Sequence, residues 1–245
     1  MKIACYKSGH SGHICYLKNG KLEFSLEAEK DSWPRYEVVT PTLNLKCMEY
    51  IDSIPDVVAI SGWIKGFHSV GDPVEGGYYG ESNETIATRE QNFLGEKVKV
   101  FTSSHERSHL MCGYGMSPFP QGKPCYALVW EGTFGSFYKI DENVHITKVG
   151  NVLEYPGGKY AFIYGLADPA LPVNSGTFRL QDAGKLMALC SYGDPEKTDA
   201  EDLDLINRIL DQDKILLTLD KGDLRDTKYF NVGVENPQFK NFARK

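Results

Sequence analysis

Two histidines that stand four positions apart are the residues of this sequence best suited to chemistry. His105 and His109 belong to the run Ser-His-Glu-Arg-Ser-His, and residues with this spacing project from the same side of a helix. Two imidazoles on one side of a helix can bind a single divalent metal ion. The alternative is a structural role, in which one histidine is exposed and the other caps the helix. The spacing alone leaves both roles open.

The same residues also match the zincin pattern HExxH, in which a glutamate acts as general base in peptide hydrolysis. Glu106 would hold that role. A zincin helix normally continues towards a third ligand, whereas Gly113, Gly115 and Pro118 are expected to end this helix within about two turns. A zinc metalloprotease is therefore the lesser hypothesis.

Two glycine-rich turns are candidates for binding phosphate, because glycines allow backbone N–H groups to approach anionic oxygens. They comprise Gly9, His10, Ser11 and Gly12, and Gly132, Thr133, Phe134 and Gly135. Ser11 and Thr133 would add hydroxyl donors, and His10 would add a donor or a proton-transfer group. A plain hairpin turn is the alternative for each. Lys185, near the start of a predicted helix, is a further candidate cation or else a solvated surface lysine.

Strand patterns place both turns between neighbouring strands. Apolar, β-favouring runs predict two sets of three strands, at residues 2–6, 13–17 and 22–28 and at residues 125–130, 136–140 and 145–149. Asn19-Gly20 in the first set suits a type I′ hairpin turn. The shift that carries Gly9 onto Gly132 also carries Gly12 onto Gly135. The sequence therefore predicts a duplicated three-strand meander and two related subdomains.

The remaining chain alternates between shorter signals. Helices are predicted at residues 43–53, 83–93, 159–168 and 184–191 and after Thr198 or Asp199, and strands at 56–61 and 97–102. A glycine-rich loop spans residues 62–80, and the tail beyond Asp220 is predicted to be polar and weakly structured. The strand at 97–102 leads into His105. Ligands of open α/β sheets usually bind beyond such strand ends.

Length and charge limit the classes of function. A chain of 245 residues suffices for one large domain or two of ordinary size. Its net charge of −6, without a Lys/Arg run, argues against an extended nucleic-acid surface. No apolar stretch approaches the ~20 residues of a membrane helix, so we expect no membrane partner and a cytoplasmic location. The six cysteines form no CxxC pair and are expected to be free thiols.

Taken together, these motifs resemble the carbamoyltransferase family that includes nodulation protein U and the antibiotic O-carbamoyltransferases. The similar stretches are residues 9–12, 18–22, 27–29, 105–109, 117–119, 129–132 and 184–193. Their order and spacing match, and the resemblance covers residues 1 to about 195. A set of ordered motifs is far more specific than any one of them.

The resemblance implies an α/β fold of the actin-like ATPase type, built from two ribonuclease-H-like halves. It also implies a relationship to the enzymes that transfer threonylcarbamoyl to tRNA. On this basis residues 1–120 would form the first subdomain, and residues 121–245 would begin a second subdomain that is truncated.

The resemblance further implies a reaction. In the family, a C-terminal domain makes carbamoyl-adenylate from ATP and carbamoyl phosphate, and the actin-like domain moves the carbamoyl group to a hydroxyl of a small-molecule acceptor. His105 and His109 would bind Fe²⁺ or Zn²⁺, Mg²⁺ is a further candidate, and His10 would lie at the nucleotide or carbamoyl pocket. The implied nucleotide contacts are Gly9, Ser11, Gly12, Glu131, Gly132, Thr133, Gly135 and Lys185.

Three departures from the family pattern affect these expectations. Glu131-Gly132 stands where the family usually has Asp-Gly, and Ser104-His105 replaces a pair of histidines. The third metal ligand and the carbamoyl-adenylate domain are expected beyond Lys245, so the domain would have to be supplied in cis or in trans. The alternative of a different class is a non-catalytic actin-like domain that binds a ligand or a partner.

Overall fold

The computed structural model describes residues 1–7, 9–64, 76–174, 179–213, 215 and 219–245 as a mixed α/β protein. These residues form two compact units, Met1–Ala127 with Lys139–Lys148, and Leu128–Tyr138 with Val149–Lys245. The boundary at residues 120 and 121 stays a prediction. The glycine-rich loop expected at 62–80 lies partly outside the described residues.

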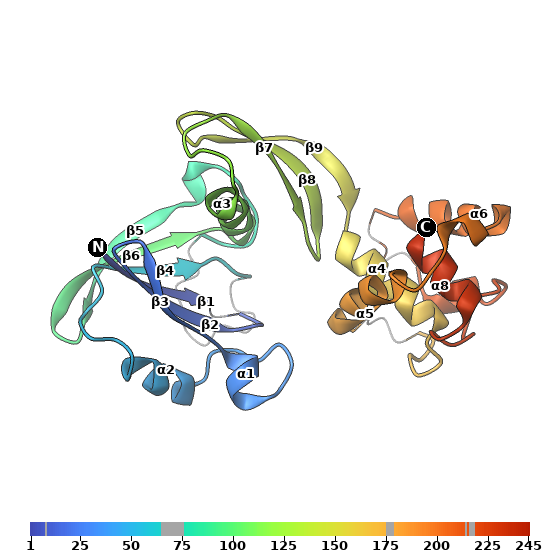
Figure 1. Ribbon diagram of the computed structural model, residues 1–245, viewed down its shortest axis with the longest axis horizontal. Helices are drawn as coiled ribbons and strands as arrows, with labels where there is room; N and C mark the ends of the chain where they lie inside the picture. Colours follow the sequence, from blue (N-terminus) through green and yellow to red (C-terminus); the bar gives the residue numbers. More distant parts are fainter. Residues whose placement is uncertain (8, 65–75, 175–178, 214, 216–218) are drawn as a thin grey trace. The chain divides into compact units, whose positions relative to one another are not determined.

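The first unit is built on a six-stranded mixed sheet with the order β3-β2-β1-β4-β6-β5 (Figure 1). Its strands are β1 (Lys2–Lys7), β2 (His13–Lys18), β3 (Lys21–Glu27), β4 (Val57–Ser61), β5 (Ala87–Phe93) and β6 (Glu96–Ser103). Strands β1, β4 and β6 run parallel to one another, while β2, β3 and β5 pair antiparallel with their neighbours. The first three strands form the predicted meander. Asn19 and Gly20 both have positive φ, as a type I′ turn requires.

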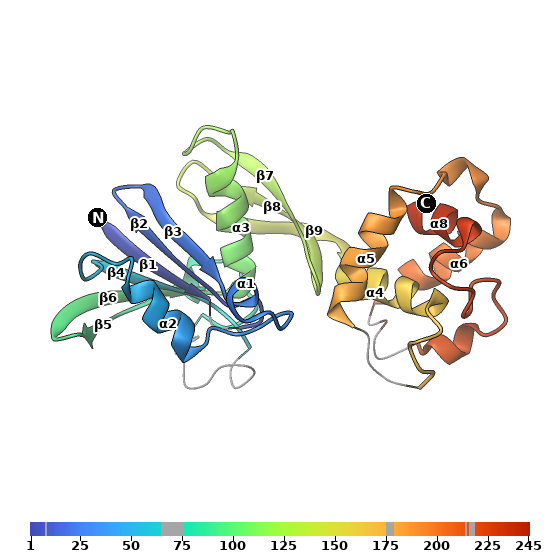
Figure 2. The ribbon, with the colours of Figure 1, turned by 60° about the horizontal axis from the view of Figure 1, so that its bottom comes forward.

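Helices lie on both faces of this sheet (Figure 2). On one face, α1 (Ala28–Ser32) and α2 (Pro41–Met48) contribute Ala28, Leu43 and Cys47 to a small core that includes Ile14 of β2. The side chain of Thr40 caps α2 by accepting the Leu43 N–H at 3.1 Å. On the other face lies α3 (His105–Met116), which follows β6 directly. The helix includes both glycines that were expected to shorten it.

The helix predicted at residues 83–93 is wrong. Ser82 caps only a 3₁₀ turn, Asn83–Thr85, and the chain then extends into β5. Leu94 and Gly95, both with positive φ, form the tight turn that pairs β5 with β6. Pairing with a neighbouring strand therefore outweighs the helical preference of this polar segment.

A second, three-stranded sheet has the order β7-β8-β9. Its strands are β7 (Cys125–Trp130), β8 (Phe134–Ile140) and β9 (Ile146–Glu154), close to the strands predicted for the second meander. The glycine-rich turn at 132–133 connects β7 to β8, as its counterpart connects β1 to β2. Duplication of a complete actin-like half stays a prediction.

The rest of the second unit is helical. It contains α4 (Pro156–Ala167), α5 (Leu180–Cys190), α6 (Ala200–Leu210) and α8 (Pro237–Arg244), with 3₁₀ turns at Pro195–Lys197 and Lys221–Leu224. Fully buried side chains from different helices, Leu166, Leu186, Ile209 and Phe239, share one core. Among the described residues, no helix is long and apolar enough to cross a bilayer.

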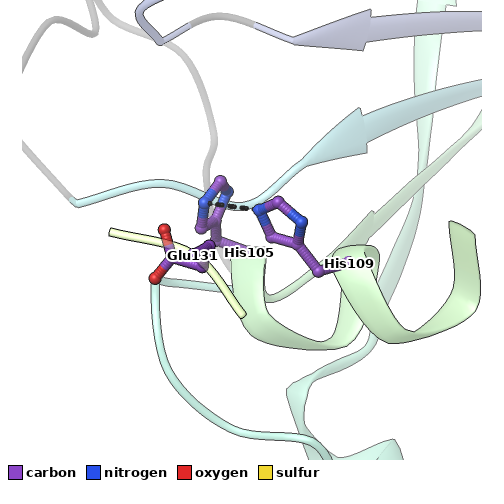
Figure 3. Close-up of side chains that lie close together, drawn as sticks. All are labelled: His105, His109 and Glu131. Atoms are coloured by element: carbon purple, nitrogen blue, oxygen red, sulfur yellow. Dashed lines mark hydrogen bonds between the residues drawn. The ribbon is translucent and has the colours of Figure 1, made fainter. Parts of the chain in front are cut away.

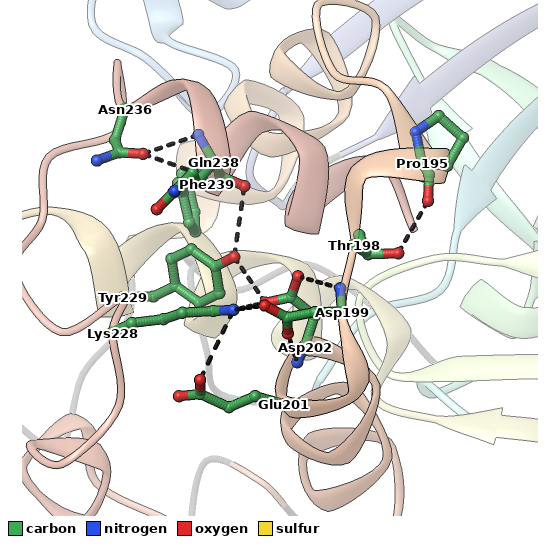
Figure 4. A network of polar contacts seen from close by, with 10 residues as sticks. All are labelled: Pro195, Thr198, Asp199, Glu201, Asp202, Lys228, Tyr229, Asn236, Gln238 and Phe239. Carbon is green, nitrogen blue, oxygen red and sulfur yellow. Dashed lines mark hydrogen bonds and ion pairs between the residues drawn. The ribbon is translucent and has the colours of Figure 1, made fainter.

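The prediction of a weakly structured tail is wrong. Phe239 and Phe242 of α8 are buried in the helical core. A polar network also ties the tail to the start of α6, where the Tyr229 hydroxyl donates to Asp202 at 2.6 Å (Figure 4). Lys228 pairs with Asp199 and Asp202 at 2.7 and 2.8 Å. Buried Leu224, Tyr229, Phe239 and Phe242 thus anchor a segment that is otherwise polar.

Candidate functional site

The first turn of α3 fixes the position of the histidine pair. Ser104 caps the helix by accepting the Arg107 N–H at 3.0 Å. The backbone N–H groups of His105 and Glu106, the first two residues of the helix, donate to the carbonyls of Gly77 and Tyr78 at 3.1 and 3.0 Å. These bonds satisfy N–H groups that a helix start otherwise leaves unpaired. His105 is thereby held just beyond the end of β6, the strand that runs parallel to β4.

The two imidazoles converge as their helical spacing predicts. The Nε2 atoms of His105 and His109 lie 3.1 Å apart (Figure 3). His105 is buried, with 5% of its surface exposed, whereas His109 is exposed. One side chain of the pair is therefore buried in the protein and the other is exposed. Their role as metal ligands stays a prediction.

The surroundings of His105 keep its imidazole neutral. Burial lowers its pKa from 6.5 to about 3, and the charges of His109 and Lys7 act in the same direction. Its ring stacks on the Tyr78 ring, with the ring centroids 4.6 Å apart, and meets the Trp63 ring edge-on at a centroid distance of 4.9 Å. A neutral imidazole is the form that binds metal, and paired imidazole nitrogens suit divalent zinc or iron. The donor set therefore fits the metal that the family resemblance implies.

Trp63 links the histidine pair to the first glycine-rich turn. The His10 ring meets Trp63 edge-on at 4.6 Å, so the indole touches both His10 and His105. The Lys7 ammonium donates to the His10 carbonyl and lies 5.2 Å from the Trp63 ring centroid. Burial lowers the pKa of Lys7 to about 8. Trp63, Lys7 and Tyr78 were not among the predicted site residues, because no motif spacing marks residues that contact a site only through the fold.

The first glycine-rich turn is shaped by close approach of other backbone and ring atoms. A Cβ on Gly9 would lie 2.8 Å from the Trp63 ring, and one on Gly12 would lie 2.3 Å from the Val39 nitrogen. The Gly12 N–H donates to the Glu37 carbonyl at 2.7 Å. Ser11 has a positive φ of 55°. The glycines here are explained by steric fit, and one predicted phosphate donor already has a partner within the chain.

The second glycine-rich turn is closed by a carboxylate. Glu131 Oε1 accepts the Thr133 N–H at 2.8 Å, the Thr133 hydroxyl at 2.7 Å and the Phe134 N–H at 3.2 Å. The first turn of α4 lies against it, because Gly157 and Gly158 donate to the carbonyls of Glu131 and Gly132. Three donors that converge on one carboxylate oxygen make a turn suited to an anion. In this structure the chain's own side chain provides that anion.

Lys185 lies on α5 in an ion-pair network. Its ammonium is 2.9 Å from Asp182 Oδ1, and Asp182, which is fully buried, also pairs with Arg179 Nε at 2.6 Å. Lys185 is thus engaged within the protein, although nearly half of its side chain is exposed. The predicted site residues divide between the units. The first unit holds Gly9, His10, Ser11, Gly12, His105 and His109, and the second holds Glu131, Gly132, Thr133, Gly135 and Lys185.

Glu106 is not placed as a zincin base would be. Only 4% of its surface is exposed, and its Oε2 accepts the Gly80 N–H at 2.8 Å. A general base must reach a water or substrate proton. The carboxylate instead holds the residue-80 segment against the start of α3, which weighs against the metalloprotease hypothesis.

Comparisons of the chain with a family model and with individual proteins agree on one family. Residues 68–232 match the family model described as carbamoyltransferase N-terminus. The chain is 41% identical over 240 residues to a 3'-hydroxymethylcephem-O-carbamoyltransferase of Amycolatopsis lactamdurans and 40% identical over 245 residues to one of Streptomyces clavuligerus. It is 26% identical over 224 residues to nodulation protein U of Bradyrhizobium diazoefficiens. The matches cover 98%, 98% and 82% of this chain but only 46%, 46% and 39% of the relatives.

Proposed function

Because the chain belongs to the carbamoyltransferase N-terminus family, we propose that it forms the N-terminal region of an O-carbamoyltransferase. The observation that carries this proposal is the identity of 40–41% with two 3'-hydroxymethylcephem-O-carbamoyltransferases along 98% of the chain. The donor is carbamoyl-adenylate, made from ATP and carbamoyl phosphate. The acceptor is a small molecule with a hydroxymethyl group of the kind named for those relatives.

The histidine pair provides the metal site of this proposal. His105 and His109 hold Fe²⁺ or Zn²⁺ through nitrogens that already converge to 3.1 Å. A divalent ion held there would supply positive charge near the carbamoyl oxygen, on which negative charge develops. Trp63 and Tyr78 pack around His105 and keep water away from its ring. His10, which also touches Trp63, is the residue that takes the proton from the acceptor hydroxyl.

The glycine-rich turns provide the phosphate contacts. The N–H groups of Thr133 and Phe134 and the Thr133 hydroxyl already bind an anionic oxygen, that of Glu131. A phosphate oxygen of ATP or carbamoyl-adenylate takes the same donors when Glu131 turns away, with Mg²⁺ as a companion ion. Lys185 adds a cation only if it leaves Asp182, since the two now pair.

The same proposal includes the wider assembly. The chain spans about half the length of the curated relatives that it matches. A C-terminal domain that forms carbamoyl-adenylate acts with it in cis or in trans, in the cytoplasm. The actin-like architecture, with subdomains at residues 1–120 and 121–245, is the fold that we propose for the complete protein.

Metal content tests the histidine pair. We expect mass spectrometry of the purified chain to find close to one equivalent of iron or zinc, and far less in the His105→Ala, His109→Ala double variant. His145→Ala is the matched control, because His145 is an exposed histidine outside the pair. Addition of Co²⁺ should also quench the fluorescence of Trp63, which touches His105, in a Trp33→Phe, Trp130→Phe background. Equal metal in the double variant and the wild type would contradict the assignment.

Transfer itself is tested by reconstitution. The chain is mixed with the C-terminal half of the Amycolatopsis relative, ATP, labelled carbamoyl phosphate and a 3'-hydroxymethylcephem. Label in the acceptor, lost with the His10→Ala variant, supports the proposed reaction. Metal and nucleotide binding without labelled product, while the full-length relative is active under the same conditions, would favour the non-catalytic binding domain.

A further inference from the structure

The first unit contains a pocket of about 560 Å³ that the proposed reaction does not use. It lies between one face of the six-stranded sheet and α3, with walls from β1, β2, β4 and β6. Most of its wall is apolar or carries sulfur, from Cys5, Cys15, Ala59, Phe101, Met111 and Cys112. Such a wall suits the hydrocarbon body of a small molecule.

Two of the residues that line the pocket are polar and buried. Ser103 at the end of β6 and Arg107 in the first turn of α3 line it, with only 5% and 7% of their surfaces exposed. Ser103 Oγ and Arg107 Nε make no hydrogen bond within the described part of the chain. The Arg107 guanidinium donates to Asn83 at 3.1 Å through another nitrogen. Buried donors without acceptors are costly, and native proteins rarely keep them without a function.

The charges around this pocket are unbalanced. Lys7 and Arg107 line it, and the described lining residues include no aspartate or glutamate. His13 also lines it, but burial lowers the pKa of this histidine and so favours its neutral form. Neither Lys7 nor Arg107 forms an ion pair among the described residues. Arg179 in the second unit shows the usual arrangement, because it pairs with both Asp168 and Asp182. A buried guanidinium without a carboxylate is destabilising unless an anion joins it.

We propose that this pocket binds a small organic carboxylate, with its apolar body along the sheet and its two oxygens at Ser103 and Arg107. Ser103 Oγ and Arg107 Nε are both buried beneath the surface of the pocket wall. Binding therefore includes a rotation of these two side chains towards the carboxylate. Two donors match the two oxygens of a carboxylate, whereas this mostly apolar wall would leave a phosphate dianion poorly paired. The guanidinium is also the group best shaped to bind a carboxylate.

This site shares Lys7 with the surroundings of the histidine pair but uses other donors, and it does not rest on the proposed function. Successive residues of a helix turn by about 100°, so Arg107 and Met111 lie on the side of α3 opposite to His105 and His109, although Cys112 of the pocket wall lies nearer the histidine side. The two sides of one helix would therefore serve a metal ion and an organic anion. Each can be tested while the other is left intact.

Calorimetry with matched aromatic probes tests the proposal. We expect the purified chain to bind 2-naphthoate at one site, and to bind 2-naphthamide, which has the same shape without the charge, at least tenfold more weakly. Arg107→Met should lose naphthoate binding, and Ser103→Ala should weaken it several-fold. Arg208→Met is the matched control, because Arg208 is an exposed arginine on α6 outside the pocket.

Several outcomes would overturn the proposal. These are no naphthoate binding at millimolar concentration, equal binding of naphthoate and naphthamide, and undiminished binding by Arg107→Met. Tighter binding of naphthyl phosphate than of naphthoate would overturn the choice of carboxylate. Near-UV circular dichroism and the melting temperature of Arg107→Met separate loss of the site from loss of the fold. We expect this variant to melt no lower than the wild type, since it removes an unpaired buried charge.

Discussion

The two glycine-rich turns occupy equivalent places in their sheets but are held by different forces. In the turn after β1, Gly9 and Gly12 leave room for the Trp63 ring and for the backbone at Val39. In the turn after β7, a Cβ on Gly135 would lie 2.8 Å from the Leu153 carbonyl oxygen, but one on Gly132 would meet nothing within 4 Å, and hydrogen bonds to Glu131 close the turn. Steric fit thus accounts for both glycines of the first turn but only for Gly135 of the second, where N–H groups also converge on an anion.

This difference separates two reasons for a GxxG pattern. A glycine that only avoids a clash supports the fold, and its N–H is free to be used elsewhere, as Gly12 shows with Glu37. A turn whose N–H groups converge on one oxygen can exchange that oxygen for another. Of the two turns, the second is therefore the stronger candidate for phosphate, although the sequence alone ranks them equally.

Alanine at the first turn should have the largest effect. Gly12→Ala places a Cβ 2.3 Å from the Val39 nitrogen, so backbone must move, and we expect a loss of about 3 kcal/mol in the free energy of unfolding. Gly132→Ala, with open space around it, should cost less than about 1 kcal/mol. Urea denaturation measures both. Similar losses for the two variants would remove the distinction between the turns.

Removal of the closing carboxylate should have the next largest effect. Glu131→Ala leaves the Thr133 and Phe134 N–H groups without their acceptor, and we expect a loss of about 2 kcal/mol. Inorganic phosphate should then raise the melting temperature of Glu131→Ala more than that of the wild type. Glu131→Gln, which keeps an acceptor oxygen, is the control. No phosphate effect in Glu131→Ala would argue against an anion-binding turn.

Acidification should destabilise the first unit through His105. The unfolded chain takes up a proton near the ordinary histidine pKa of 6.5, whereas the folded protein does so only near 3. The unfolded state therefore binds more protons between these values, and stability falls as the pH is lowered. From pH 7 to 5.5 we expect a loss of about 1 kcal/mol from this residue. His105→Gln should flatten the profile, while His145→Gln, at an exposed histidine, should not.

Local patterns predicted most strands and helices of this fold. The Asn19-Gly20 turn, the Asp199 cap of α6 and the strand before His105 each depend on neighbouring residues, and each is found. Residues 83–93 were assigned to the wrong element because only pairing with β6 decides their conformation. Phe239 and Phe242 were missed because their partners lie on distant helices.

The candidate site was predictable only in its helical part. The spacing of His105 and His109 suffices to bring their nitrogens together, since one helix carries both. Trp63 and Lys7 join them only through the sheet, and no local pattern indicates such contacts. Glu131 was identified from a motif, but its role in closing the turn depends on side-chain hydrogen bonds that a sequence does not specify.

Lys185→Met should have the smallest effect on the free energy of unfolding. It tests whether this lysine of the second unit stabilises the fold or binds a ligand. Asp182 keeps its bond to Arg179 when Lys185 is removed, and the Lys185 side chain is 44% exposed. We therefore expect a loss below about 1 kcal/mol in urea denaturation. Arg179→Met is the contrasting variant, because it removes the partner of both Asp168 and Asp182 and should cost more. If Lys185→Met instead proves as damaging as Arg179→Met, the lysine is needed for the fold. A small stability loss with a large loss of ATP affinity would place Lys185, with the Glu131 turn, in nucleotide binding.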